Sequence, residues 1–308
     1  MSVLGVRTVR NKGAWGCRVV KRSQPFAGKR LIRNASIAFF VLVAGSGVLP
    51  VQAATGGHPG GEFPYQLRAA TDWALFATGL QLSVAGLALD QQYLLPTAED
   101  RGLASFDHDS VPWLDRLIMH PYSEIHHNAS HALFAAAMIA PIPVLMGRQD
   151  RGAVRTIGVM YGQTVLLSFG LKRTLVHAFP RYRPQSYYDE GPRSLHREQN
   201  SRMSFPSGHT AHPFAAATFA TTVFAELHPE SNYRYAVAAG TYGMAAGVAG
   251  LRVMAGKHFL TDVLAGAALG SFAGWLVPRL HRADRTHDYT LQPLLSPEGL
   301  GAMMRVAL

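Results

Sequence analysis

Residues 259–278 read FLTDVLAGAALGSFAGWLVP, an apolar stretch whose one charged side chain is Asp262. Its length is close to the about 20 residues that a helix needs to cross a bilayer. Gly266, Gly270 and Gly274 recur every four residues, so they share one face of the predicted helix. Such a face lets a second helix approach closely, either in a membrane or in the core of a soluble bundle.

Working outward, the chain contains further apolar segments of this length with few or no charges. We predict helices over 73–89, 131–146, 157–171, 207–225, 235–251 and 259–278. The predicted fold class is therefore all-α, a bundle of about five or six apolar helices that span a membrane, with the functional site at one end. The mean hydropathy of +0.06 makes the membrane assignment a mild one.

The N-terminal segment carries most of the net charge of +10, because residues 1–35 hold nine Lys/Arg and no acid. The rest is nearly neutral, so the pI of 10.0 does not indicate nucleic-acid binding. An apolar run at 37–51 and the small residues Ala53-Ala54 follow. This order is typical of a cleaved export signal, and an uncleaved anchor is the alternative. The single cysteine, Cys17, lies here, so cleavage would leave no disulfide and no catalytic thiol.

The predicted organisation has four parts. They are an export signal or N-terminal anchor (1–54), a linker with an accessory helix and loop (55–130), a helical core that carries the candidate site (131–280) and a C-terminal tail (281–308).

Two arginine-rich loops predict the orientation. The loop near 147–156 and the segment after Pro278 each carry three arginines, which favours the cytoplasmic side. Residues 172–206 and 252–257 then lie on the periplasmic side of an inner membrane. A chain exported from residue 55 onward conflicts with this orientation unless the first predicted helix lies along the membrane surface, and both alternatives stay open.

His258 and Asp262 are four residues apart and share a helix face. A carboxylate so placed can fix the tautomer of the imidazole and leave the other ring nitrogen as a nucleophile. A plain helix-stabilising pair is the alternative. The start of an apolar segment favours the functional interpretation, because an ionisable pair is costly there.

The tetrapeptide Pro206-Ser207-Gly208-His209 suits the start of a helix, since Ser is a good N-cap. The free amides of such an end bind phosphate, Gly208 leaves room for it, and His209 could protonate a leaving alkoxide. A solvated histidine at a helix start is the alternative.

A cationic stretch comes before this tetrapeptide. Seven Lys/Arg and three acids lie between Lys172 and Arg202, which is also typical of a solvated loop or a headgroup-binding patch. Arg183 precedes a proline, and Arg252 comes six residues before His258. Guanidinium groups suit phosphate oxygens and stabilise charge in a transition state.

These three groups of residues together resemble the signature of the type 2 phosphatidic acid phosphatase superfamily, K-x6-RP, PSGH and SR-x5-H-x3-D. The superfamily includes lipid phosphatases, bacterial class A acid phosphatases and vanadium haloperoxidases. The second motif is complete at 206–209, and the third is Arg252-x5-His258-x3-Asp262 with Leu251 in place of Ser. The resemblance covers roughly 130–280.

The first motif departs from the pattern. Lys172 lies eleven residues before Arg183 instead of seven, as if about four residues were inserted. Arg173 and Arg181 are therefore rival candidates for its phosphate-binding position.

The resemblance implies a nucleophilic His258 that becomes a phosphohistidine, an Asp262 that orients it and a general acid, His209. It implies no metal and no cofactor, and the sequence has no HExxH or CxxC motif. The implied phosphate-binding residues are Lys172, Arg183, Ser207, Gly208 and Arg252.

The expected function is a metal-independent phosphatase for a lipid phosphate or pyrophosphate, with an anionic lipid substrate, a membrane and no nucleic acid as partners. Its expected location is an inner membrane with the site facing the periplasm. A soluble periplasmic acid phosphatase of broad specificity is the alternative. A haloperoxidase is disfavoured by the short chain, and a non-enzymatic transporter leaves the His209, His258 and Arg252 constellation unexplained.

Overall fold

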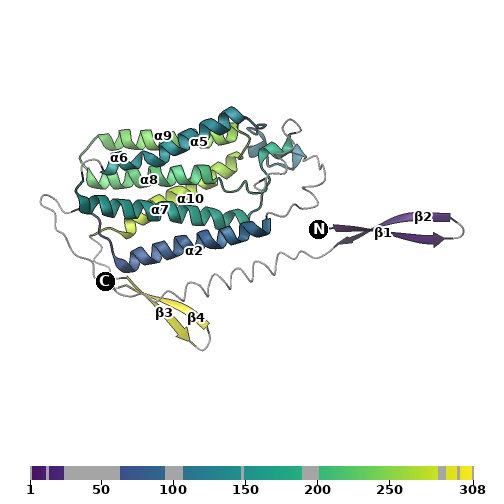
Figure 1. The fold of residues 1–308 in the computed structure, drawn as a ribbon, viewed down its shortest axis with the longest axis horizontal. Helices are drawn as coiled ribbons and strands as arrows, with labels where there is room; N and C mark the ends of the chain where they lie inside the picture. The colour runs from purple at the N-terminus through teal and green to yellow at the C-terminus, as the bar shows by residue number, and fades with distance from the viewer. Residues whose placement is uncertain are drawn as a thin grey trace. The chain divides into compact units, whose positions relative to one another are not determined.

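The computed structural model describes residues 2–11, 14–23, 63–93, 107–146, 149–188, 201–283, 289–296 and 299–306. In these ranges most residues of the central part are helical (Figure 1). The long helices are α2 (Ala69–Tyr93), α5 (Glu124–Ile139), α7 (Arg151–Ala178), α8 (Gly208–Leu227), α9 (Tyr233–Met254) and α10 (Leu260–Leu280). Short elements are η1 (His108–Ser110), α4 (Trp113–Arg116), α6 (Pro141–Met146) and η2 (Pro184–Tyr187). The predicted helical bundle is confirmed.

The bounds of two predicted helices are clearly wrong. The helix predicted over 157–171 is longer at both ends, since α7 spans Arg151–Ala178. The helix predicted over 131–146 is displaced and divided. The helix begins at Glu124 and ends at Ile139, and α6 starts anew at Pro141. The polar run from Glu124 to Ser130 hid this start, because it lacks the apolar pattern by which the other helices were found. The helical core therefore reaches further toward the N-terminus than the predicted 131–280.

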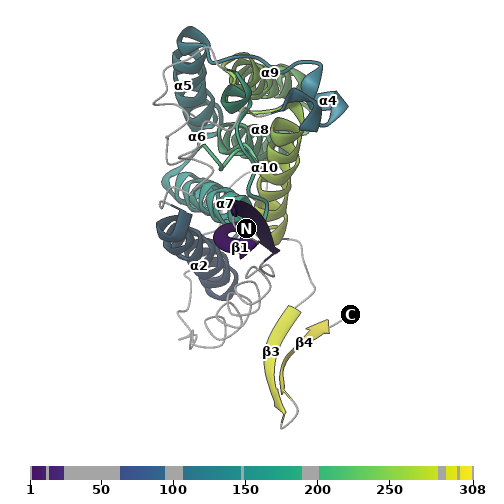
Figure 2. The ribbon, with the colours of Figure 1, turned by 90° about the vertical axis from the view of Figure 1, so that its right-hand side faces the viewer.

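The α8 and α10 helices start at the same end of the bundle and are in very close contact, and Figure 2 shows α10 beside α8. A Cβ added at Gly270 would overlap the carbonyl oxygen of Ala211, and one added at Gly266 would overlap that of Ser207. The predicted glycine face thus does bring a second helix close, and the partner is α8. This contact also sets the starts of the two helices side by side.

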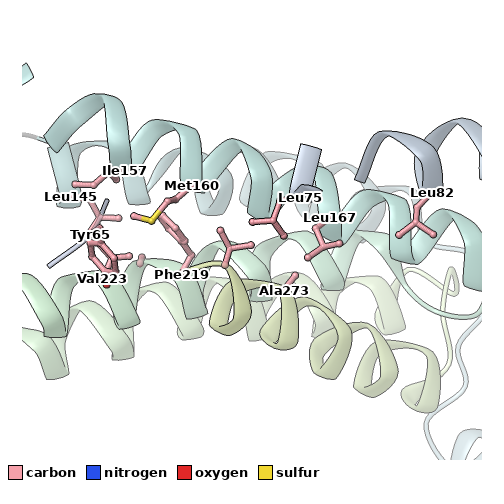
Figure 3. Packing of buried hydrophobic residues seen from close by; sticks show 12 residues of the cluster. Tyr65, Leu75, Leu82, Leu145, Ile157, Met160, Leu167, Phe219, Val223 and Ala273 are labelled. Atoms are coloured by element: carbon pink, nitrogen blue, oxygen red, sulfur yellow. The ribbon is translucent and has the colours of Figure 1, made fainter. Parts of the chain in front are cut away.

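The α2 helix belongs to the same bundle and runs parallel to α7. Asp72 accepts a hydrogen bond from Gln163 Nε2 at 2.9 Å near the start of α2, and Asp90 pairs with Arg173 near its end. Leu75 and Leu82 of α2 pack into the main hydrophobic cluster, part of which Figure 3 shows. The helix that we predicted as accessory therefore packs along the core.

Two ends of the bundle can now be distinguished. At the site end, α7 terminates while α8 and α10 begin; at the basic end, α7 begins while α10 terminates. Arg151 and Arg155 lie in the first turns of α7, and Arg279 and Arg282 lie at the end of α10. The predicted cytoplasmic arginines that the structure describes are thus all at the basic end.

Three helical stretches are long and apolar enough to cross a membrane by length and composition, namely Ala69–Asp90, Glu124–Leu145 and Leu260–Leu280.

Strands occur in both terminal regions, beyond the predicted bundle. β1 (Ser2–Asn11) pairs antiparallel with β2 (Ala14–Ser23), and this hairpin belongs to a separate compact unit. β3 (Tyr289–Ser296) and β4 (Gly299–Val306) form a second two-stranded sheet. The apolar run of the predicted export signal, 37–51, lies outside the described residues, so that assignment stays a prediction.

Candidate active site

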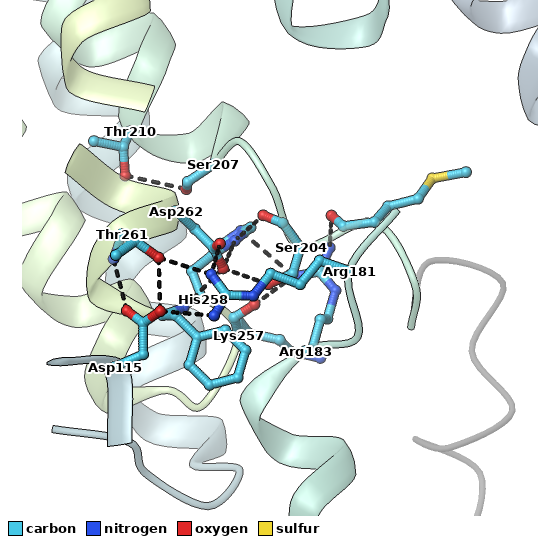
Figure 4. Close-up of polar contacts among 12 residues, drawn as sticks. Asp115, Arg181, Arg183, Ser204, Ser207, Thr210, Lys257, His258, Thr261 and Asp262 are labelled. Atoms are coloured by element: carbon cyan, nitrogen blue, oxygen red, sulfur yellow. Dashed lines mark hydrogen bonds and ion pairs between the residues drawn. The ribbon is translucent and has the colours of Figure 1, made fainter. Parts of the chain in front are cut away.

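His258 lies in the short connection between α9 and α10, with 3% of its surface exposed. Its Nδ1 donates a hydrogen bond to the Ser204 carbonyl oxygen at 2.8 Å, which leaves the lone pair on Nε2 (Figure 4). Arg183 Nη1 lies 3.4 Å from that Nε2. Burial, aided by the charges of Arg183 and Arg252 and opposed by Asp262, lowers the pKa of His258 to about 3. The ring is therefore a neutral base that presents Nε2 beside two guanidinium groups.

Asp262 stands behind His258 without a short hydrogen bond to it, since 3.8 Å separates Asp262 Oδ2 from His258 Nδ1. The Oδ2 atom accepts hydrogen bonds from Ser204 Oγ at 2.5 Å and from the Phe259 amide at 2.9 Å. Asp262 and the Ser204 carbonyl thus both face the Nδ1 edge of His258. The expected orienting role falls to the carbonyl by direct contact and to Asp262 by its charge and its hold on Ser204.

Arg181 binds two buried carboxylates and is turned toward them. Its Nη1 donates to Asp262 Oδ1 at 2.8 Å and its Nη2 to Asp115 Oδ2 at 2.6 Å. Asp115, on α4, also accepts from the Thr261 amide at 2.9 Å. Burial alone would lower the pKa of Arg181, but the two carboxylates outweigh it and raise the pKa. Arg181 therefore acts as part of the support for Asp262.

The rival cations of the first motif lie in different places. Arg173 pairs with Asp90 of α2 and faces that helix. The side chain of Lys172 passes Gly208, because a Cβ built on that glycine would lie 3.1 Å from Lys172 Cε. Of the three cations, Lys172 is thus the one whose side chain passes the start of α8, and its closeness gives Gly208 a reason to lack a side chain.

Arg183 and Arg252 are held by acceptors from different parts of the chain. Arg183 Nη1 donates to the Lys257 carbonyl at 2.9 Å. Arg252 Nη1 donates to His127 Nδ1 at 3.0 Å and to Ser130 Oγ at 3.2 Å, both on α5. Each guanidinium is thus fixed by protein acceptors near His258, as a preorganised anion site requires.

The start of α8 lies where the sequence predicts it, with Ser207 as N-cap and Gly208 as the first helical residue. The Ser207 side chain makes no capping hydrogen bond; its Oγ accepts from Thr210 Oγ1 at 3.1 Å. The Ser207 amide donates to the Asp262 carbonyl at 3.0 Å, which ties the second motif to the third. His209 follows in the first turn, and its Nε2 lies 3.2 Å from His131 Nδ1.

The structure therefore brings together the three motifs predicted from the sequence. Four further residues were missed: His127, His131, Asp115 and Ser204. The pattern HHNASH over 126–131 could have signalled the first two, since His127 and His131 share one helix face. For Asp115 no local signal exists. Among the described residues, no group of three His, Cys, Asp or Glu side chains could hold a metal ion.

A helical bundle that gathers two arginines, a neutral histidine and a helix start has the groups that bind phosphate in proteins. Comparison with known sequences agrees, because residues 153–285 match the PAP2 superfamily. The matched residues contain all three motifs, so this part of the chain is similar to the type 2 phosphatidic acid phosphatase (PAP2) superfamily.

Three similar proteins are lipid A 1-phosphatases. Those of Rhizobium etli and Rhizobium johnstonii are each 36% identical, over 40% and 39% of this chain and 48% and 46% of their own lengths. That of Porphyromonas gingivalis is 34% identical over 32% of this chain and 21% of its own. The chain thus aligns with half or less of each relative. A solved phosphatidylglycerolphosphate phosphatase of Bacillus subtilis is 24% identical, with a TM-score of 0.36 over 68% of this chain and 96% of its own.

Proposed function

We propose that the chain is a membrane-associated phosphatase that hydrolyses a lipid phosphate or pyrophosphate through a phosphohistidine, without a metal. The observation that carries the proposal is that Arg183 Nη1 lies 3.4 Å from the Nε2 lone pair of a neutral His258. The charge of Arg252 also acts on His258, and His209 stands in the first turn of α8. Such an arrangement can bind a phosphate dianion, attack it and protonate the leaving oxygen.

The reaction has two balanced halves. His258 Nε2 forms a bond to phosphorus while the P–O bond to the lipid breaks, and the departing oxygen takes a proton from the imidazolium form of His209, which is left neutral. Water then attacks the phosphohistidine, His209 takes back a proton from that water, and the P–N bond breaks to release inorganic phosphate. The Ser204 carbonyl stabilises the His258 ring throughout, because it accepts a hydrogen bond from Nδ1–H.

The names of the relatives suggest the substrate to test first, which is lipid A carrying a 1-phosphate. The experiment is inorganic phosphate release by purified protein in detergent, from lipid A, phosphatidate, phosphatidylglycerol phosphate and undecaprenyl pyrophosphate. We expect His258→Ala to abolish release from the preferred lipid and to remove an acid-labile phosphoenzyme trapped from the wild type. Full turnover by folded His258→Ala protein would overturn the proposal.

A membrane setting is supported by the surface of the three candidate spans. Only 22% to 39% of each apolar window is buried within the protein, which leaves most of each for contact with lipid. The soluble alternative predicts release of the protein by osmotic shock without detergent. We expect the protein to stay with the membrane fraction.

A further inference from the structure

We propose that His131 is a positioning residue for His209, holding the Nε2 edge of that ring where the leaving oxygen arrives. The inference rests on the proposed function, in which His209 is the general acid. His131 belongs to α5, an element outside all three motifs of the sequence.

The His209 ring is held by two side chains of α5. Its Nε2 is 3.2 Å from His131 Nδ1, and the two rings meet edge to face with centroids 4.7 Å apart. Phe134, three residues further along α5, packs at 5.0 Å between ring centroids. One imidazole donates the shared hydrogen bond and the other accepts it. The contact therefore fixes the angle of the His209 ring and keeps its Nε2, not its Nδ1, on the side of α5.

The same face of α5 reaches the phosphate-binding cations. His131 meets the ring of His127 at 4.6 Å between centroids, and His127 Nδ1 accepts from Arg252 at 3.0 Å. His209 and Arg252 thus contact His131 and His127, which are one helical turn apart on α5. A small shift of α5 would move both groups, which gives the acid a fixed place relative to the bound phosphate.

The chemistry explains what a hydrogen-bond partner at this nitrogen does. A general acid must lie within about 2.6–3.2 Å of the oxygen that it protonates. Before the substrate arrives, His131 Nδ1 lies 3.2 Å from His209 Nε2 and occupies the place of an acceptor. The leaving oxygen then replaces His131 Nδ1 as that acceptor. The proton passes from Nε2 of protonated His209 to this oxygen as the P–O bond breaks, which leaves His209 neutral, and His131 neither gains nor loses a proton.

The test uses two phosphates whose leaving groups differ in their need for a proton. Dodecyl phosphate releases a strongly basic alkoxide, whereas p-nitrophenyl phosphate releases a stable phenolate. We expect His131→Ala to lower kcat/KM for dodecyl phosphate by about tenfold to a hundredfold, a part of the typical contribution of a general acid. The loss for p-nitrophenyl phosphate should stay below about threefold.

Two variants of similar size sharpen the test. The amide of Asn can occupy the position of an imidazole Nδ1, whereas that of Gln reaches the position of Nε2. His131→Asn should therefore recover most of the activity on dodecyl phosphate, and His131→Gln should behave like His131→Ala. If the Ala variant is unstable, the Asn and Gln pair carries the comparison. His126→Ala, on the same helix with its Nδ1 2.8 Å from Ser123 Oγ, is the matched control.

The outcomes separate the inference from the function. Equal losses on both substrates would show a merely structural role, as would additive losses when His131→Ala is combined with His209→Ala. Either result overturns the inference. Failure of the wild type to release phosphate from any substrate, or full activity of His258→Ala, would instead overturn the proposed function.

Discussion

Asp262 lies 3.8 Å from His258, while His258 Nδ1 donates its direct hydrogen bond to the Ser204 carbonyl. The position of Asp262 therefore depends on what holds its two oxygens. Ser204 and the Phe259 amide hold Oδ2, and Arg181 holds Oδ1. Asp262 in turn accepts a hydrogen bond from Ser204 Oγ. A displaced Asp262 carboxylate would therefore affect the proposed nucleophile both through its charge and through the Ser204 carbonyl.

Arg181→Lys tests this support. A lysine keeps the charge but cannot form two directed hydrogen bonds to Asp115 and Asp262, since it lacks the planar fork. We expect kcat to fall by up to about a hundredfold, the effect of a misplacement of about 1 Å, with a lower Tm. The inhibition constant for inorganic phosphate should stay within about threefold.

Lys172→Met is the comparison, because it removes the cation that passes Gly208. We expect it to weaken inhibition by phosphate at least about tenfold. If Arg181→Lys weakened phosphate binding and Lys172→Met did not, Arg181 would be the phosphate ligand and the assignment would be wrong.

The sequence could predict the residues of the site that stand within short motifs, since residue type and spacing identify their chemistry. It could not choose among Lys172, Arg173 and Arg181, because that choice depends on which way each side chain points from the end of α7. Asp115 was beyond prediction for a similar reason. Asp115 pairs with Arg181, which is far away in the sequence. The local sequence around Asp115 does not indicate this tertiary contact.

At the scale of elements, the contact between α8 and α10 positions the site, because Ser207 and Asp262 stand at the two helix starts. The closest approach is at Gly270, where an added Cβ would meet backbone atoms of Ala211 and Ala215. Backbone atoms cannot rotate away as a flexible side chain can. A larger residue there must therefore separate the helices.

Gly270→Ala should destabilise the protein by about 1–3 kcal/mol, the usual cost of overpacking, and lower kcat because the helix starts move apart. Thermal unfolding in detergent and the phosphate-release assay measure the two effects. Gly243→Ala on α9 is the control, since nothing lies within 4 Å of its added Cβ, and it should be neutral or stabilising. Equal melting temperatures for the two variants would contradict the role given to the glycine face.

The helices were predictable where an uninterrupted apolar run identifies them, as for α8, α9 and α10. The start of α5 was not, because its polar residues include His127, Ser130 and His131, which face the site. Polar residues that contact Arg252 and His209 stand there in place of an apolar pattern. The helix whose start the sequence did not predict is therefore α5, which carries His131.

At the scale of the whole bundle, the two ends differ in a way that predicts an orientation. Arg151 and Arg155 begin α7, Arg279 and Arg282 follow the end of α10, and the candidate site lies at the other end. Positively charged ends of membrane helices favour the cytoplasm. Because α2 packs along α7, the alternative in which it lies flat on the membrane is disfavoured, and its start shares the basic end.

We therefore propose that the site faces away from the cytoplasm, and cysteine labelling tests this. In a Cys17→Ser background the chain has no other cysteine, so single cysteines can be placed at exposed residues of each end. Glu124 lies at the start of α5 on the site end, and Glu230 lies between α8 and α9 on the basic end. A membrane-impermeant maleimide should label Glu124→Cys in cells whose outer membrane is permeabilised, and Glu230→Cys only after lysis. The opposite pattern would place the phosphate-binding arginines in the cytoplasm, and a substrate in the outer leaflet would then be out of reach.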